Sequence, residues 1–158
     1  MTRLYGRAPT NKRVNDYVPD VRFERTSIIS TLGIDGVSAS LMFKGTLNGD
    51  FFEWYVENIL APTLSPGDIV VLDNYSAHKV NGVLDPIYDV GASVMFLPPY
   101  SPDLNPIELM WSKVKSILRK LKPRTPDKLQ NAVKIALNSI TQSDITGWFN
   151  YDGYVVDL

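Results

Sequence analysis

Two short apolar runs, each bounded by polar residues, constrain the fold of this chain more than any other feature. The first is the Ile-Val-Val-Leu run between Asp68 and Asp73, and the second spans residues 93–97. A continuous apolar run of this length is typical of a strand that is buried on both faces of a sheet. Residues 79–90, interrupted by Pro86, predict a weak helix between the two runs. Strands joined in this way usually pair in parallel through a right-handed crossover, so the sequence predicts an α/β architecture.

Further elements precede and follow this unit. Residues 27–32 and 37–43 are β-prone and enclose a glycine-bounded connection, which predicts a β-hairpin. Apolar residues at helical spacing then predict a helix that is capped by Asp50 and ended by Pro62. Two more helices and an aromatic tail that packs back are expected at residues 106–121, 126–140 and 148–156. The expected order is β-β-α-β-α-β-α-α, a mixed sheet covered by helices.

The composition fits a single globular domain over residues 1–158. Hydrophobic residues make up 44% of the chain and charged residues 21%, and the 17 acidic and 16 basic side chains nearly cancel, so net charge indicates no partner. The absence of cysteine excludes disulfides and thiolate metal sites. No apolar run approaches the roughly 20 residues that span a bilayer, and residues 1–25 form an irregular basic lead-in without a signal-peptide core. We therefore expect a cytoplasmic protein that does not associate with membranes.

Two carboxylates are expected at one edge of the sheet. Asp73 ends the first apolar strand, and Glu108 follows a loop that is stiffened by four prolines after the second strand. The carboxyl ends of parallel strands meet at the edge where open α/β folds bind ligands, so the two side chains can meet there. Each also has a purely structural interpretation. Asp73 can be a strand-end turn residue, and Glu108 can complete a capping box with Asn105 ahead of Pro106.

A basic ridge follows Glu108 on the predicted helix. Residues 113–124 contain six basic residues and no acidic one, and Glu108 shares a helical stripe with Lys115 and Arg119. Such a ridge can bind phosphates, or its cations can simply complement the carboxyl end of a helix. His78, the only histidine, lies five residues after Asp73 and can likewise be a local hydrogen-bonding residue.

Two motifs resemble the catalytic blocks of a known family. The stretch VVLDNYSAH, followed by LPPYSPDLNPIELMWSKVK, is similar to the second and third catalytic blocks of DDE transposases of the mariner-like superfamily, in the bacterial insertion-sequence group. Asp73 and Glu108 are separated by the 34 residues 74–107, a spacing typical of that superfamily. The opening TRLYGRAPTNKR resembles the segment after the first catalytic strand, so the resemblance covers almost the whole chain.

The resemblance implies an RNase H-like fold in which three acidic residues bind two divalent ions, Mg²⁺ or Mn²⁺. Asp73 and Glu108 match the second and third of these acids and are the implied catalytic and metal-binding residues. Asn74 and His78 match companions of the second block that orient ligands or contact DNA. The implied DNA-binding residues of the ridge are Lys113, Lys115, Arg119 and Lys120.

The family pattern also includes a first strand with a first aspartate, upstream of the Tyr-Gly-Arg-Ala-Pro segment. Asp16, Asp20 and Asp35 follow that segment and do not match this acid. We therefore expect the chain to be the C-terminal, N-terminally truncated part of a DDE catalytic domain, lacking the first central strand and inactive alone. The implied partners are the double-stranded DNA of mobile-element ends and target, a second copy in a homodimer, and an upstream transposase polypeptide.

The implied activity is metal-dependent DNA cleavage and strand transfer, as in DNA transposition. Two alternatives remain open. The chain can be a non-catalytic DNA-binding or regulatory remnant of a transposase, which the basic ridge would serve without any metal. It can also be another RNase H-like nuclease, such as one that cuts RNA in hybrids, although the long proline motif argues against that.

Overall fold

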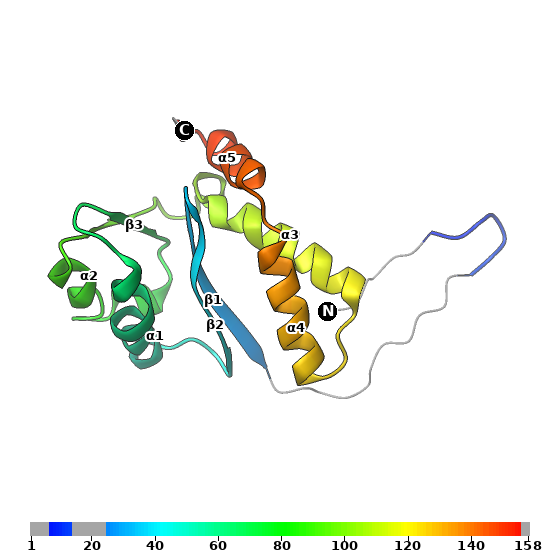
Figure 1. The fold of residues 1–158 in the computed structure, drawn as a ribbon, viewed down its shortest axis with the longest axis horizontal. Helices are drawn as coiled ribbons and strands as arrows, with labels where there is room; N and C mark the ends of the chain where they lie inside the picture. The colour runs from blue at the N-terminus through cyan, green and yellow to red at the C-terminus, as the bar shows by residue number, and fades with distance from the viewer. Residues whose placement is uncertain (1–6, 14–24, 156–158) are drawn as a thin grey trace.

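The computed structural model describes residues 7–13 and 25–155, and within them two small sheets form (Figure 1). Strands β1 (Thr26–Gly33) and β2 (Gly36–Lys44) pair antiparallel, as the hairpin prediction requires. Strands β3 (Ile69–Leu72) and β4 (Ser93–Phe96) pair in parallel, which confirms the predicted crossover unit. Within the described ranges, no ladder of hydrogen bonds joins one sheet to the other.

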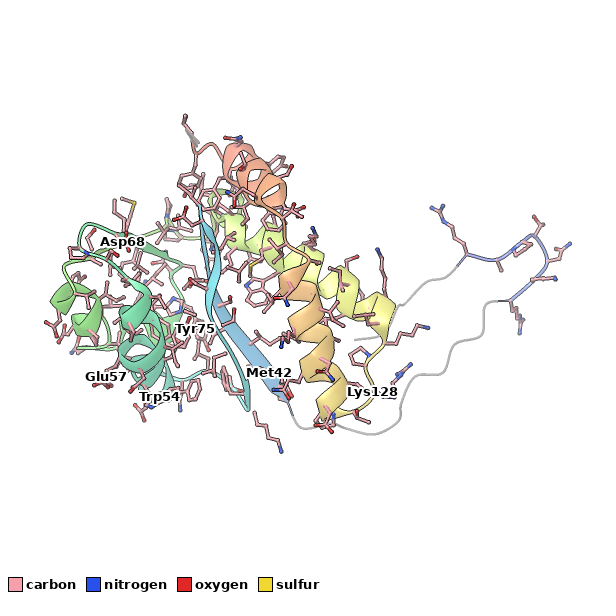
Figure 2. The ribbon with its side chains drawn as sticks, in the orientation of Figure 1. Met42, Trp54, Glu57, Asp68, Tyr75 and Lys128 are labelled. Atoms are coloured by element: carbon pink, nitrogen blue, oxygen red, sulfur yellow. The ribbon has the colours of Figure 1, made fainter. Side chains whose placement is uncertain are left out.

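Five α-helices connect and cover these strands in the described part of the chain. Their bounds are α1 (Gly49–Tyr55), α2 (Asp85–Asp89), α3 (Pro106–Leu121), α4 (Pro126–Asn138) and α5 (Gln142–Tyr151). Helix α1 continues through a π-helical turn, η1 (Val56–Leu60), and a 3₁₀ turn, η2 (Ala61–Thr63), so helical structure lasts to the predicted stop near Pro62. Trp54 and Glu57 project from the outer surface of this segment (Figure 2).

Several predicted details are corrected. The N-cap of α1 is Asn48, whose Oδ1 accepts from the Phe51 N–H at 2.9 Å, and Asp50 lies inside the first turn. Pro86 lies in the first turn of α2, where its missing N–H has no intrahelical partner to lose, so it starts this helix rather than interrupting one. Part of the expected aromatic tail is helical, because Thr141 and Asp144 form a capping box that starts α5. The lead-in over residues 1–25 lies mostly outside the described residues.

The first core holds both sheets in one layer. Helix α1, η1 and α2 supply Phe52, Tyr55, Val56, Leu60 and Ile87, all buried. Apolar side chains from all four strands pack against this cluster, namely Ile29, Leu41, Val70, Leu72 and Val94. The two sheets therefore share a single hydrophobic core on one face although they do not pair with each other.

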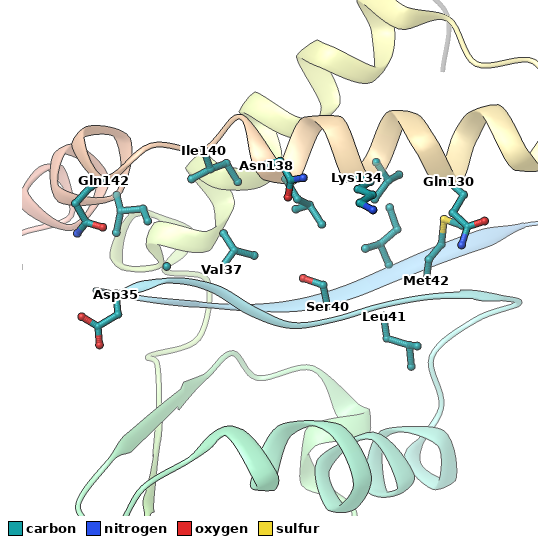
Figure 3. Close-up of a pocket in the computed structure, with 15 residues that line it drawn as sticks. Asp35, Val37, Ser40, Leu41, Met42, Gln130, Lys134, Asn138, Ile140 and Gln142 are labelled. Carbon is teal, nitrogen blue, oxygen red and sulfur yellow. The ribbon is translucent and has the colours of Figure 1, made fainter.

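The second core covers the opposite face of the hairpin only. Helix α3 contributes Met110, Val114 and Leu118, and α4 contributes Ala132, Val133 and Ala136. Ile28 and Met42 of the hairpin pack against this cluster, and α4 runs over the strands with several side chains directed toward them (Figure 3). The buried stripe of α3 ends at Leu118, and Leu121 at the end of the helix is exposed.

The prediction that β3 and β4 are buried on both faces is wrong. Val70 and Leu72 pack on the first core, but Ile69 and Val71 are 60% and 41% exposed, and Met95 is 55% exposed. The reason is that α3 and α4 pack over β1 and β2 and leave the outer face of β3 and β4 uncovered. In this chain a continuous apolar run therefore predicts a strand correctly but does not predict that both of its faces are buried.

The C-terminal segment is tied to the proline loop. The Tyr154 hydroxyl donates to the Leu104 carbonyl at 2.8 Å, which confirms that the aromatic tail packs back on the domain. Asp152, only 7% exposed, has one carboxyl oxygen without a hydrogen-bond partner in the described structure. Burial, helped by the nearby charge of Asp103, raises the pKa of Asp152 above its ordinary value. The same loop that carries the chain toward Glu108 thus lies beside a carboxyl group whose pKa is raised by burial.

Candidate active site at the carboxyl edge of the parallel strands

Asp73 directly follows β3 and has a fixed orientation. Its Oδ1 accepts the Tyr75 N–H at 3.0 Å and lies 2.9 Å from Nδ1 of His78. Its Oδ2 makes no hydrogen bond to the described part of the chain, and the side chain is 53% exposed. One oxygen therefore holds the carboxylate in place while the other is free to bind a ligand from solution.

His78 acts as a support for this carboxylate. The imidazole is largely buried against the ring of Phe52, with centroids 4.4 Å apart, and meets the ring of Tyr75 edge-on at 5.6 Å. Nδ1 also lies 3.4 Å from the Asp73 carbonyl oxygen. This local hydrogen-bonding role agrees with the structural interpretation of the lone histidine, and a contact between His78 and DNA stays a prediction.

Asn74 joins the ends of the two parallel strands. Its Nδ2 donates to the Leu97 carbonyl at 2.5 Å, next to the ladder bond from the Leu97 N–H to the Leu72 carbonyl at 2.9 Å. The side-chain amide is thereby used to fix the start of the proline loop beside Asp73. Its expected DNA contact likewise stays a prediction.

The proline loop leads from β4 through a 3₁₀ turn, η4 (Pro102–Leu104), to α3. Asn105 is the N-cap of α3, but its side chain makes no capping hydrogen bond, so the predicted capping box is wrong. Only its carbonyl engages the first turn, by accepting the Glu108 N–H at 3.0 Å. The Glu108 carboxylate is exposed and makes no hydrogen bond to the described residues, so capping does not compete with ligand binding.

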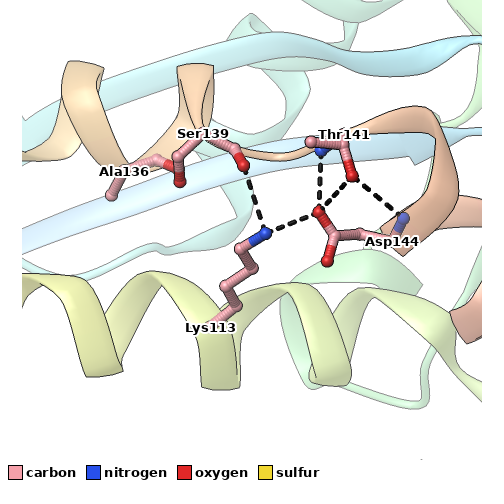
Figure 4. Close-up of polar contacts among 5 residues, drawn as sticks. All are labelled: Lys113, Ala136, Ser139, Thr141 and Asp144. Atoms are coloured by element: carbon pink, nitrogen blue, oxygen red, sulfur yellow. Dashed lines mark hydrogen bonds and ion pairs between the residues drawn. The ribbon is translucent and has the colours of Figure 1, made fainter.

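Lys113 is engaged in hydrogen bonds within the protein and is 31% exposed (Figure 4). Its Nζ donates to the Ser139 carbonyl at 3.1 Å and to Oδ2 of Asp144 at 2.5 Å, which links α3 to the end of α4 and to the first turn of α5. The run of basic residues over 113–124 is what assigns this lysine to the predicted DNA-binding ridge. Lys115 and Lys120 are exposed and Arg119 is half-buried, so these three remain the candidates for phosphate contacts.

The Lys113–Asp144 pair predicts an acid-sensitive contribution to stability. The hydrogen bond from Lys113, with those from the Thr141 side chain and backbone, lowers the pKa of Asp144 to about 2 from an ordinary 3.8. An acid whose pKa is lower in the folded state than in the unfolded state stabilises the fold above its unfolded pKa. This contribution is therefore present above about pH 4 and is lost as the pH falls toward 2. We expect Lys113→Met to cost about 1 to 2 kcal/mol at pH 7 and to flatten the decline below pH 4, as measured by urea unfolding. Lys115→Met is the control, and pH profiles of equal slope for the Lys113 variant and the parent protein would contradict the assignment.

Sequence reasoning missed the residues that hold these carboxylates. Phe52 contacts the His78 ring, and the Tyr75 N–H orients Asp73; the sequence pattern singled out neither residue for this role. The described residues contain no group of three or more His, Asp or Glu side chains that could hold a metal ion. No helix in the described part of the chain is long and apolar enough to cross a membrane.

The parallel β3–β4 unit within a mixed, helix-covered layer defines an α/β domain of the RNase H-like class, and likeness to solved structures confirms this fold. The Mos1 strand transfer complex matches with a TM-score of 0.74 and 16% identity over 95% of this chain and 46% of that chain. The Mos1 transposase paired-end complex with the left transposon end matches with a TM-score of 0.74 and 15% identity, over 95% of this chain and 47% of that chain. A pre-cleavage Mos1 transpososome matches with a TM-score of 0.70 and 14% identity, over 99% of this chain and 53% of that chain. The chain thus spans about half the length of these transposase chains.

The sequence itself identifies the family. The model of the DDE superfamily endonucleases matches residues 1–130, so the chain belongs to this family. No curated protein matches the sequence.

Proposed function

We propose that this chain forms part of the catalytic domain of a DDE transposase, in which Asp73 and Glu108 are two of the metal-binding acids. The observation that carries the proposal is the state of the two carboxylates. Asp73 is oriented through Oδ1 and open at Oδ2, and Glu108 is exposed and not used as a cap. Both are hard oxygen donors of the kind that Mg²⁺ and Mn²⁺ prefer, so the residues present suit these ions.

Bound divalent ions would activate an attacking oxygen and stabilise a leaving oxygen at a phosphodiester. The chain's own residues orient and expose the ligands. The Tyr75 N–H and His78 fix one carboxylate, and Asn74 fixes the loop that leads to the other. The proposed reactions are cleavage at the ends of a mobile element followed by strand transfer, in keeping with the named states of the similar Mos1 complexes.

A third acid is proposed to come from a further strand. The two sheets share one core on α1 and α2 but do not pair with each other, so each sheet keeps edges with unpaired backbone groups. A strand from an upstream transposase polypeptide, placed between the hairpin and β3, would pair with both edges. Such a strand would also bring its aspartate into the layer that carries Asp73.

The proposed nucleic-acid partner is double-stranded DNA, and the proposed active assembly is a homodimer on paired ends. Exposed Lys115 and Lys120 on α3, with Arg119 between them, offer phosphate contacts on the helix that begins at Glu108. The same cations favour the second candidate function, a regulator that binds DNA without cutting it. That function requires salt-dependent binding in the absence of metal, retained by variants that lack both acids.

The test joins this chain to the polypeptide encoded immediately upstream and supplies duplex DNA that carries the ends of its own element. With Mn²⁺ we expect nicks at the element ends, followed by joined products, and neither in the presence of a chelator. An RNA–DNA hybrid of the same sequence should stay intact. A joined protein that unfolds cooperatively yet leaves the ends uncut would overturn the proposal, and DNA binding by that protein in chelator would support the regulator.

A further inference from the structure

A groove of about 670 Å³ runs between α4 and the β1–β2 hairpin, away from the two carboxylates (Figure 3). Five of its lining residues belong to β2 and only one to β1, so it follows the second strand of the hairpin. One end lies at the hairpin turn, where Nε2 of Gln142 donates to the Ile34 carbonyl at 2.7 Å. The groove is therefore a channel along β2 that α4 overhangs.

Its helical side is a regular row of polar side chains. Gln130, Lys134 and Asn138 are four residues apart on α4, so they share one stripe, and in Figure 3 all three extend toward the strands. Each is exposed, and none makes a hydrogen bond or ion pair within residues 7–13 and 25–155. Two amides and one ammonium group are thus available to a ligand. An amide both donates and accepts hydrogen bonds, as a peptide backbone requires.

Its floor combines apolar side chains with a free strand edge. Ile28, Val37 and Met42 of the hairpin supply apolar surface, and Leu137 adds to it from α4. In the described sheet β2 pairs only with β1, so its other edge presents backbone N–H and C=O groups without strand partners. An unpaired edge beside an apolar channel is the arrangement that binds an extended peptide as an added strand.

The charges of the groove favour a peptide over nucleic acid. Lys134 is its single cation, and Asp35 at the hairpin end is its single anion. A phosphate backbone would meet one lysine and one repelling carboxylate, whereas duplex DNA is normally held by several cations. A peptide with an acidic residue opposite Lys134 and a neutral or basic residue beside Asp35 complements both charges.

We propose that this groove binds an extended segment of a partner protein, which adds to β2 as a strand and places an acidic side chain against Lys134. The inference goes beyond the proposed transposition chemistry, because it uses neither Asp73 nor Glu108. It also assigns a role to a face of α4 on which Lys134 and its polar neighbours are otherwise unengaged in the described structure.

The experiment selects binders from a library of random twelve-residue peptides displayed on phage, with the full chain as target. We expect enriched peptides that alternate apolar and polar residues and carry an acidic residue. In a two-dimensional NMR titration they should shift the amide signals of β2 and α4. Lys134→Glu should weaken their binding about fivefold to tenfold, while Lys128→Glu, on an exposed turn of α4 outside the groove, should leave it unchanged.

Each other result overturns the proposal. No enrichment, or shifts that map outside the groove, would show that it binds no extended segment. If the Lys134 variant binds the peptides as tightly as the parent protein does, Lys134 does not pair with an acidic side chain of the peptide. Loss of peptide binding as the chain dimerises, followed by sedimentation over a range of concentrations, would assign the groove to a second copy of this chain. Cooperative unfolding of the Lys134 variant, measured separately, should show that any weaker peptide binding is not caused by loss of the fold.

Discussion

Replacement of Asp73 by asparagine, or of Glu108 by glutamine, is expected to reduce Mn²⁺-dependent cleavage by the joined transposase about a thousandfold, or about 4 kcal/mol in activation free energy. Each change removes one anionic oxygen donor and leaves the shape of the side chain nearly unchanged. The asparagine retains Oδ1 as an acceptor for the Tyr75 N–H, so the strand end should keep its conformation. Single-turnover cleavage of labelled element ends, resolved on a denaturing gel, measures the effect.

The matched control is Glu57→Gln, an exposed acid on η1 far along the chain from both carboxylates. It should cut at the parent rate. Urea unfolding of all three variants should give midpoints close to that of the parent protein, because neither Asp73 nor Glu108 is buried. Cleavage within about threefold of the parent rate in either acid variant would contradict the proposed role of that residue as a metal ligand.

Phe52→Ala is expected to have the largest effect on stability, about 3 to 5 kcal/mol. The ring is only 2% exposed, lies in the core that joins the two sheets, and supports the His78 ring from below. A loss of this size is a large part of the 5 to 15 kcal/mol that typically stabilises a domain. The cavity would also release His78, so Asp73 would lose one of the two groups that orient it.

Urea denaturation followed by circular dichroism measures this loss. Trp54→Ala is the control, because Trp54 lies two residues away on the same helix but is 46% exposed, and it should cost less than about 1 kcal/mol. If the Phe52 and Trp54 variants unfold at the same urea concentration, the first core does not hold the two sheets together as described. NMR signals of the His78 ring should shift only in the Phe52 variant.

Local patterns predicted the elements that carry the site. The parallel pairing of β3 and β4 followed from two apolar runs and an intervening helix. Helix α3 has the predicted bounds, with Pro106 at its start and a buried apolar stripe that extends as far as Leu118. The placement of Asp73 at a strand end and of Glu108 in a first helical turn depends on these same features. Both are short-range properties of the chain.

The remaining details depend on contacts between distant residues. Lys113 shares the composition of the basic ridge, and only the fold brings Asp144, 31 positions later, to its ammonium group. Asn105 has the ideal residue type for a side-chain cap, but the backbone geometry at the end of the proline loop does not use it. The outer face of β3 is exposed because α3 and α4 pack on the hairpin instead. The sequence of a strand alone does not show which strands the helices cover.

The proline loop is anchored at both ends, by Asn74 on the Leu97 carbonyl and by Tyr154 on the Leu104 carbonyl. An inserted or deleted residue between these anchors would have to break one of them or displace the start of α3. Insertions between His78 and β4, in contrast, enter the exposed turns around α2 and leave both anchors intact. Relatives in which the two acids are more widely spaced should therefore carry their extra residues before β4, and the segment from Leu97 to Leu104 should keep its length.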